Sequence, residues 1–128
     1  WKYQDGIEYN RCIQCFFDMK KQLQKLSEKY MKRYGLLPGF KAGIHYGRVV
    51  AGEVGIIKRD ITFSGDVLNT TSRIQGKCKE FDMEIVASDD LLNSLKLDGK
   101  YTTQFLGSIK LRGKEKDVEL STVVSATI

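Results

Sequence analysis

The chain has 128 residues, of which 41% are apolar and 29% charged, and it contains a single proline. Such a composition can bury the core of one globular domain, so it excludes an intrinsically disordered protein and predicts one domain over residues 1–128. The formal net charge of +5 is compatible with nucleic-acid binding, but neither zinc-finger spacing nor an aromatic RNA-binding motif accompanies it. A phosphate-binding site and a lysine-rich helix surface explain the charge equally well, so we expect no nucleic-acid partner.

The three cysteines are an odd number, and the chain has neither a signal peptide nor an apolar run long enough to cross a bilayer. We therefore expect a cytoplasmic location, either as a cytoplasmic protein or as the cytosolic domain of a membrane protein. Cys12 and Cys15 have redox or zinc-type spacing, but they lie in a helical pattern without a second pair, which favours buried, unreactive thiols. The only histidine, His45, lies in an apolar segment without a neighbouring acid, which favours a packed structural role.

The first predicted element is one long amphipathic helix over residues 7–34, followed by Gly35 and Pro38, which end it. Its apolar residues recur at helical spacing, at positions 13, 16, 17, 23, 26 and 30. Two strands are predicted next, over residues 40–46 and 49–54, joined by a tight hairpin turn at Gly47.

A short third strand is predicted to end near Phe63, and a helix to begin near Asp66. The second half of the chain then predicts further elements, namely a buried strand over 83–87, a short helix over 89–97 capped by Asp89 or Asp90, and paired strands over 102–111 and 118–124. This order favours an α/β (α+β) sandwich, in which a mainly antiparallel sheet carries flanking helices over one face.

The helix that begins near Asp66 separates apolar from polar residues. Its apolar stripe is formed by Val67, Thr71, Ile74, Cys78 and Phe81. Asn69 and Arg73 point away from this stripe and, being four residues apart, lie one turn above the other. Taken alone, the two residues are typical of a solvated surface, but the residues around them favour a binding site for one ligand.

Two motifs carry a family resemblance, the glycine-rich run AGIHYGRVVAG over residues 42–52 and ITFSGDVLNTTSR over residues 61–73. With Leu111-Arg112-Gly113-Lys114 they match, in type, order and spacing, the catalytic domain of class III adenylyl and guanylyl cyclases. The resemblance extends from about Gly6 to Val124. It implies the palm-like, ferredoxin-like cyclase fold and formation of a cyclic nucleotide with release of pyrophosphate.

Within this resemblance, four positions correspond to catalytic or phosphate-binding residues. Asn69 would hold the ribose, and Arg73 would stabilise the charge that develops on the α-phosphate, for which a planar guanidinium is well suited. Arg48 corresponds to the arginine that binds pyrophosphate. Arg112 stands where many relatives carry a lysine for the terminal phosphates, and Lys110 or Lys114 could replace it.

Thr62 corresponds to the position that reads the purine, where the family uses Asp or Thr in adenylyl cyclases and usually Cys in guanylyl cyclases. This favours ATP, although a hydroxyl that both donates and accepts leaves GTP as an alternative. The resemblance also implies two Mg²⁺ or Mn²⁺ ions held by two Asp residues upstream of Trp1. We assign no metal ligand in this chain, and we expect a partial catalytic domain that is inactive alone.

The family assembles its active sites across a head-to-tail dimer, so the resemblance predicts a homodimer with shared sites. Gly76 lies on the same helix face as Asn69 and could allow close approach of the partner. One alternative is a catalytically inactive cyclase-homology domain that only dimerises or binds nucleotide. The presence of Arg48, Asn69 and Arg73 favours an enzyme, since dimerisation alone requires none of them.

Overall fold

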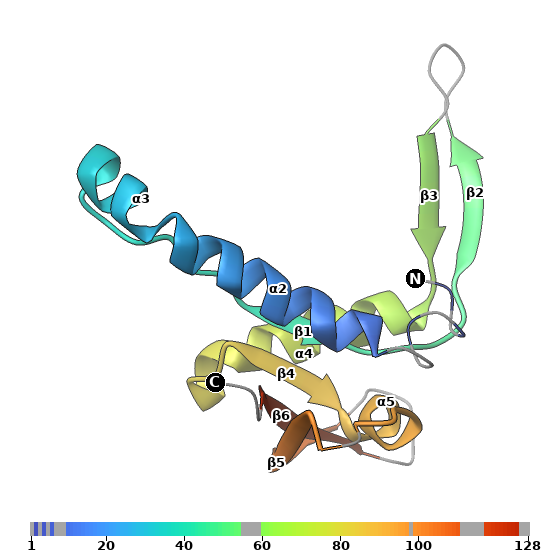
Figure 1. Ribbon diagram of the computed structural model, residues 1–128. Helices are drawn as coiled ribbons and strands as arrows, with labels where there is room; N and C mark the ends of the chain where they lie inside the picture. Colours follow the sequence, from blue (N-terminus) through green and yellow to red (C-terminus); the bar gives the residue numbers. More distant parts are fainter. Residues whose placement is uncertain are drawn as a thin grey trace.

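The computed structural model describes residues 10–54, 60–97, 99–110 and 117–125, together with Lys2, Gln4 and Gly6. The backbone alone is described for 52–54 and 60–64. In chain order the elements are α2 (Arg11–Lys25), α3 (Ser27–Tyr34), β1 (Ala42–Ile44), β2 (Val50–Val54), β3 (Asp60–Ser64), α4 (Asp66–Phe81), β4 (Ile85–Ser88), α5 (Asp89–Ser94), β5 (Tyr101–Ile109) and β6 (Val118–Ser125) (Figure 1).

The long N-terminal helix predicted over residues 7–34 is divided into α2 and α3 at Leu26. The backbone of Leu26 leaves the helical region, with φ −92° and ψ 3°. Its N–H still donates to the carbonyl of Gln22, so the direction of the helix is nearly kept. The predicted end is confirmed, because Gly35 adopts a left-handed backbone (φ 70°) and donates its N–H to the carbonyl of Met31.

Four strands form a mixed sheet in the order β1-β4-β6-β5. β1 is parallel to β4, with Gly43 opposite Val86, whereas β6 runs antiparallel to both β4 and β5. The predicted α/β class is thus confirmed, but the sheet is more mixed than the mainly antiparallel one expected. A β-bulge interrupts the β5–β6 register between Phe105 and Gly107.

Helices cover both faces of this sheet, which corrects the prediction of helices over one face. All four residues of β4 are buried, and successive side chains alternate between two hydrophobic clusters. Ile85 and Ala87 pack with α2 and α5, through side chains that include Ile13, Phe16 and Leu91. Val86 packs with Ile74 and Cys78 of α4 on the opposite face. A strand buried on both faces needs a helical layer on each of them.

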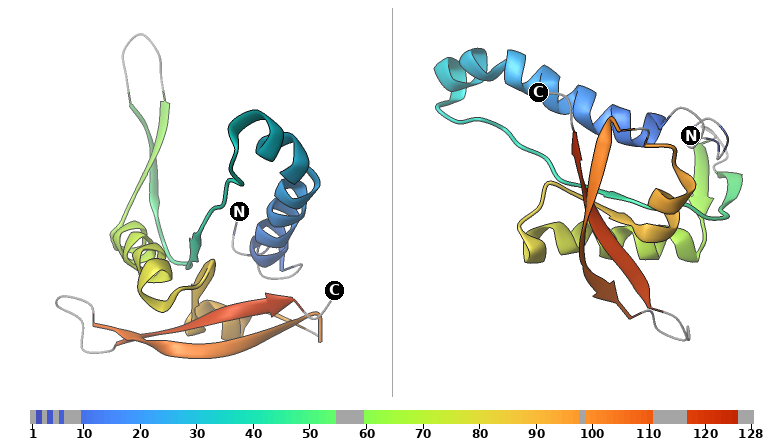
Figure 2. Two further views of the ribbon diagram at one scale, coloured as in Figure 1. Left: turned by 90° about the vertical axis from the view of Figure 1, so that its left-hand side faces the viewer. Right: turned by 60° about the horizontal axis from the view of Figure 1, so that its bottom comes forward.

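The predicted hairpin between residues 40–46 and 49–54 does not form. β1 takes β4 as its hydrogen-bonding partner, while β2 pairs antiparallel with β3 in a separate two-stranded sheet. This β2–β3 ribbon projects from the body of the molecule in Figure 1 and in the left view of Figure 2. Residues 45–49, which include Arg48, therefore connect two sheets and do not form a hairpin turn.

The β4–α5 junction also differs in detail from the prediction. Ser88, not Asp89 or Asp90, is the N-cap of α5, and its hydroxyl accepts a hydrogen bond from the N–H of Leu91 (3.4 Å). The helix ends earlier than expected, because the backbone of Leu95 is extended (ψ 150°). Among the residues that the structure describes, no helix combines the length and apolarity needed to cross a lipid bilayer.

Candidate active site

Helix α4 presents Asn69 and Arg73 on its exposed side. Its buried residues are Thr70, Ile74 and Cys78, which anchor the opposite side of the helix in the core. The i, i+4 spacing therefore places the two polar side chains on one accessible face, as the helical pattern predicts. Their exposure leaves them free to meet a ligand that approaches α4 from outside the domain.

The guanidinium of Arg73 connects α4 to the end of strand β5. Its Nη2 donates a hydrogen bond to the carbonyl oxygen of Lys110 over 2.9 Å. A guanidinium has five N–H donors, so this bond orients the group while leaving most of its donors for phosphate oxygens. Lys110 immediately precedes the segment that contains Arg112, which lies outside the described residues.

Two glycines of the first motif bring α4 against β1 and the segment that follows it. A Cβ added at Gly43 would lie 2.5 Å from the backbone nitrogen of Gln75 in α4. A Cβ added at Gly47 would lie 2.7 Å from a methyl group of Val67. Only residues without side chains allow these approaches, so the spacing of the first motif sets the position of the helix that carries the second.

Arg48 lies beside the N-terminal end of α4. Its carbonyl oxygen would be 3.1 Å from a Cβ at Gly65, the residue that precedes the helix and has a φ of 147°, which favours glycine. A pocket of about 490 Å³ opens here, lined by His45, Tyr46, Gly47, Arg48, Asp66, Val67, Thr70, Asp90, Asp117 and Val118. Neither Asn69 nor Arg73 is among these lining residues, although Asp66 and Thr70, three or four positions away on α4, are.

The charges around this pocket disfavour the binding of an anion that brings no cation with it. Asp66, Asp90 and Asp117 contribute three carboxylates, whereas Arg48 is the cation among the described lining residues. A triphosphate bound against Arg48 would be repelled by these carboxylates unless further cations accompanied it. Sequence reasoning missed this acidic lining, because the three aspartates come from three distant parts of the chain.

His45 and Ser88 hold the end of β1 against α5. His45 Nδ1 lies 2.6 Å from the hydroxyl oxygen of Ser88, which is fully buried and caps α5. This contact supports the predicted structural role of His45. Sequence reasoning did not find Ser88, although a serine directly before two aspartates is a recognisable helix-start signal.

The structure describes the remaining predicted site residues only in part. Thr62 lies in β3 with its backbone opposite Gly52 of β2, but its side chain, like all of Arg112 and Lys114, is outside the described residues. Nowhere in the described ranges do three His, Cys, Asp or Glu side chains gather in a way that could hold a metal ion.

The three cysteines are free thiols. Burial raises the pKa of Cys12 and Cys78, which keeps both thiols protonated and unreactive. Cys15 is half-buried, which corrects the prediction that it is fully enclosed, and its sulfur lies 3.9 Å from the sulfur of Met19. The CxxC spacing therefore forms no disulfide in this structure.

The sequence model of the adenylate and guanylate cyclase catalytic domain matches residues 6–123, which is nearly the whole chain. The chain belongs to this family. The cyclase domain is also 30% identical over 128 residues to adenylate cyclase 2 of Rhizobium meliloti (strain 1021). That alignment covers 100% of the chain but only 35% of the relative.

Solved structures agree with this cyclase fold. The crystal structure of the adenylyl cyclase CyaB from P. aeruginosa matches with a TM-score of 0.66 at 21% identity, covering 86% of this chain and 55% of that one. The guanylate cyclase domain of RhGC from Catenaria anguillulae, solved in complex with GTP, matches with a TM-score of 0.50 at 26% identity. This second match covers 65% of the cyclase domain and 43% of the solved chain. The predicted cyclase fold is therefore confirmed.

Proposed function

We propose that the chain is part of the catalytic domain of an adenylate cyclase, which converts ATP to cyclic AMP and pyrophosphate. The observation that carries this proposal is the Asn69–Arg73 pair on the exposed face of α4, with Arg73 oriented by Lys110. The bond to Lys110 fixes the direction of the guanidinium and leaves most of its donors for a phosphate. The adenylate cyclase relative from Rhizobium meliloti supports ATP as the substrate.

The reaction joins the ribose 3′-oxygen to the α-phosphorus and releases pyrophosphate, with the 3′-hydroxyl proton passing to solvent or to a base. Catalysis of this kind depends on positioning and on charge stabilisation. The amide of Asn69 can hold the ribose by donating and accepting hydrogen bonds. Arg73, one turn further along α4, can donate to the oxygens of the α-phosphate as their negative charge increases.

We further propose that the complete site forms between two copies of the chain. Arg48 lines a pocket at the N-terminal end of α4, and neither Asn69 nor Arg73 is among the residues that line it. One nucleotide could then contact all three residues if Arg48 came from one subunit and Asn69 and Arg73 from its partner. Such an arrangement gives a homodimer two equivalent sites.

Divalent cations fit the electrostatics of this proposal, although the described residues form no site for them. When bound with the nucleotide, Mg²⁺ or Mn²⁺ would neutralise phosphate charge. The carboxylates of Asp66, Asp90 and Asp117 make such neutralisation necessary for a triphosphate to approach Arg48.

Substrate choice is tested by incubating the full-length protein with ATP or GTP, each with Mg²⁺ or Mn²⁺, and measuring both cyclic products. We expect cyclic AMP to be the main product. Dominant cyclic GMP formation would replace the proposal with a guanylate cyclase, the activity named for the RhGC domain. A folded protein that binds nucleotide but forms neither product would be an inactive cyclase-homology domain.

Gly76 provides a test of the proposed dimer. A Cβ at this position meets nothing within 4 Å, so the chain itself tolerates a side chain there. We expect Gly76→Trp to leave the fold intact but weaken dimerisation, because the indole would project from the exposed side of α4 toward the partner. Sedimentation-velocity ultracentrifugation measures this change. Unchanged association, with Gly39→Trp as a control for an exposed indole at another open position, would show that Gly76 lies outside the interface.

A further inference from the structure

The tip formed by α3 and the residues that follow it projects from the body of the molecule. Figures 1 and 2 show α3 at the end of α2 that lies farthest from α5 and the β2–β3 ribbon. None of the eight residues of α3 is buried. Packing against the described core therefore does not explain the apolar residues of α3.

The apolar residues of this tip are large and strongly exposed. Met31 is 51% exposed and Tyr34 60%, and after the turn at Gly35 the side chains of Leu36 and Leu37 are 59% and 58% exposed. Scattered apolar residues are normal on a protein surface, but four large exposed ones fall here within seven positions of the chain. We call these four residues the tip patch.

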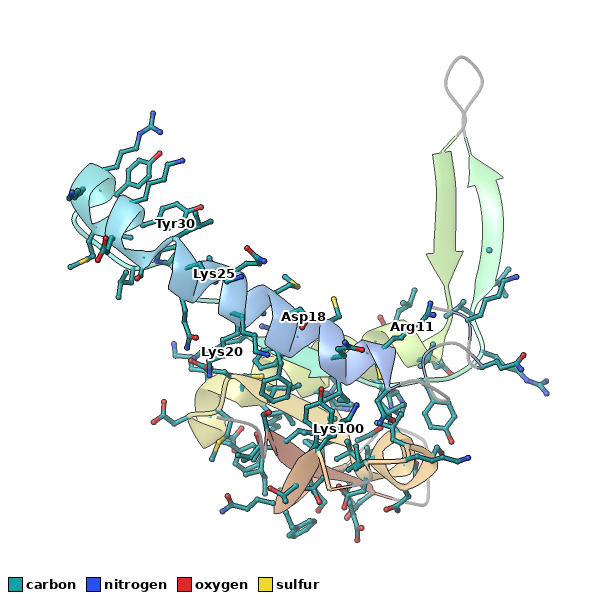
Figure 3. All side chains as sticks on the ribbon, viewed as in Figure 1. Arg11, Asp18, Lys20, Lys25, Tyr30 and Lys100 are labelled. Atoms are coloured by element: carbon teal, nitrogen blue, oxygen red, sulfur yellow. The ribbon has the colours of Figure 1, made fainter. Side chains whose placement is uncertain are left out.

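Exposed cations accompany the tip patch in the sequence. Lys25, Lys29, Lys32 and Arg33 are all exposed, and the single acid of α3 is Glu28. On the helical wheel the cations occupy the side opposite Tyr30 and Tyr34, with Arg33 at the boundary. Its guanidinium lies 5.7 Å from the centre of the Tyr34 ring. In Figure 3 the side chains of the tip stand clear of the sheet, with Lys25 and Tyr30 labelled along the helix.

We propose that this tip docks on the surface of an anionic lipid membrane. A short amphipathic helix with one apolar side and one cationic side can lie in the headgroup region, where the apolar side chains enter the acyl boundary and the cations meet lipid phosphates. Tyr30 and Tyr34 suit this depth, because a tyrosine ring is apolar and its hydroxyl is polar. Charge complementarity favours this occupant over a neutral apolar partner, since the cations would otherwise lose hydration without gaining a counter-charge.

The residues of the proposed cyclase site on α4 do not belong to the tip. Arg73 bonds to Lys110 at the end of β5, and β5 contributes no residue to the tip. Docking through α3 would therefore involve neither Arg73 nor Lys110. Membrane docking of this kind does not depend on the proposed cyclase activity.

The test is co-sedimentation of the full-length protein with vesicles of phosphatidylcholine alone or of phosphatidylcholine with phosphatidylserine. Two triple variants are compared, Lys29→Gln/Lys32→Gln/Arg33→Gln in the tip and Lys79→Gln/Lys96→Gln/Lys100→Gln elsewhere on the surface. Both remove three exposed cations, so they change the net charge equally. We expect the tip variant to bind phosphatidylserine vesicles about tenfold to a hundredfold more weakly, and the control to bind nearly as wild type.

A third variant, Leu36→Ser/Leu37→Ser, separates the apolar contribution from the charge. We expect it to weaken binding to phosphatidylserine vesicles while preserving the salt dependence that the cations cause. Equal losses for the tip and control triple variants would overturn the proposal, because binding would then depend on net charge alone. A tip variant that alters self-association in ultracentrifugation but not vesicle binding would also overturn it and would assign the patch to a protein contact.

Discussion

Replacing Arg73 by alanine is expected to lower the turnover of ATP by about two to three orders of magnitude, as for the loss of a single transition-state donor. The guanidinium is exposed on α4 and is oriented by the carbonyl of Lys110, so its removal should disturb the fold little. The measurement is the rate of cyclic AMP formation by the full-length protein as a function of ATP concentration. We expect kcat to fall far more than KM rises, since the interaction strengthens only as charge develops.

Lys79→Ala is the matched control for Arg73→Ala. Lys79 is an exposed cation in the last turn of the same helix, so its loss removes the same charge from α4. Arg73→Lys keeps the charge but not the planar fork, and it should also be strongly impaired. Equal activity of the Arg73→Ala and Lys79→Ala proteins would contradict a catalytic role for Arg73.

Mixing subunits extends the same experiment to the proposed shared site. Co-expressed Arg48→Ala and Arg73→Ala subunits form heterodimers in which one site carries both defects and the other carries neither. With random pairing and two sites per dimer, about a quarter of the wild-type activity should return. No recovery would place Arg48 and Arg73 in the same subunit's site.

Replacing Gly43 by alanine is expected to lower the free energy of unfolding by about 3 kcal/mol, at the upper end of the range for overpacked cores. The added methyl group would lie 2.5 Å from the nitrogen and 2.6 Å from the Cα of Gln75, and neither backbone atom can rotate away. Helix α4 must therefore shift from β1. Because that shift displaces Asn69 and Arg73, cyclase activity should fall as well. Urea denaturation followed by circular dichroism measures the change in stability.

Two other glycine-to-alanine variants show whether the steric cause is right. Gly47→Ala should cost less than Gly43→Ala, because the group it meets is a methyl of Val67 at 2.7 Å, which a side-chain rotation can move. Gly76→Ala should stabilise the protein by about 1 kcal/mol, since it gains helix propensity in open space. A similar loss of stability in all three variants would mean that glycine flexibility, and not close packing, is what these positions require.

Much of the fold could be predicted because its helices and strands have strong local patterns. Helix α4 begins at Asp66 as expected, and Gly35 ends the N-terminal helical region. The break at Leu26 was missed, because apolar periodicity continues through it and only the backbone departs from the helix. Element boundaries depend on such local backbone geometry more than on side-chain pattern.

Strand pairing could not be predicted from the local pattern. The segment around Gly47 is typical of a hairpin, yet β1 pairs with β4, whose residues lie about 40 positions further along the chain. Pairing of distant strands depends on which apolar faces can be buried together, and Val86 and Ile85 bury opposite faces of the same strand. The same fact accounts for the helices on both faces of the sheet.

The sequence by itself determined the family and the Asn69–Arg73 pair, because motif spacing and the position of a residue on a helix are local properties. The tertiary structure alone decided that Arg48 faces a pocket with Asp66, Asp90 and Asp117, since these residues meet only through long-range packing. It also decided the function of the motif glycines. Gly43 and Gly47 have no side chains because α4 must pass within van der Waals contact of their backbone, and only the folded chain places it there.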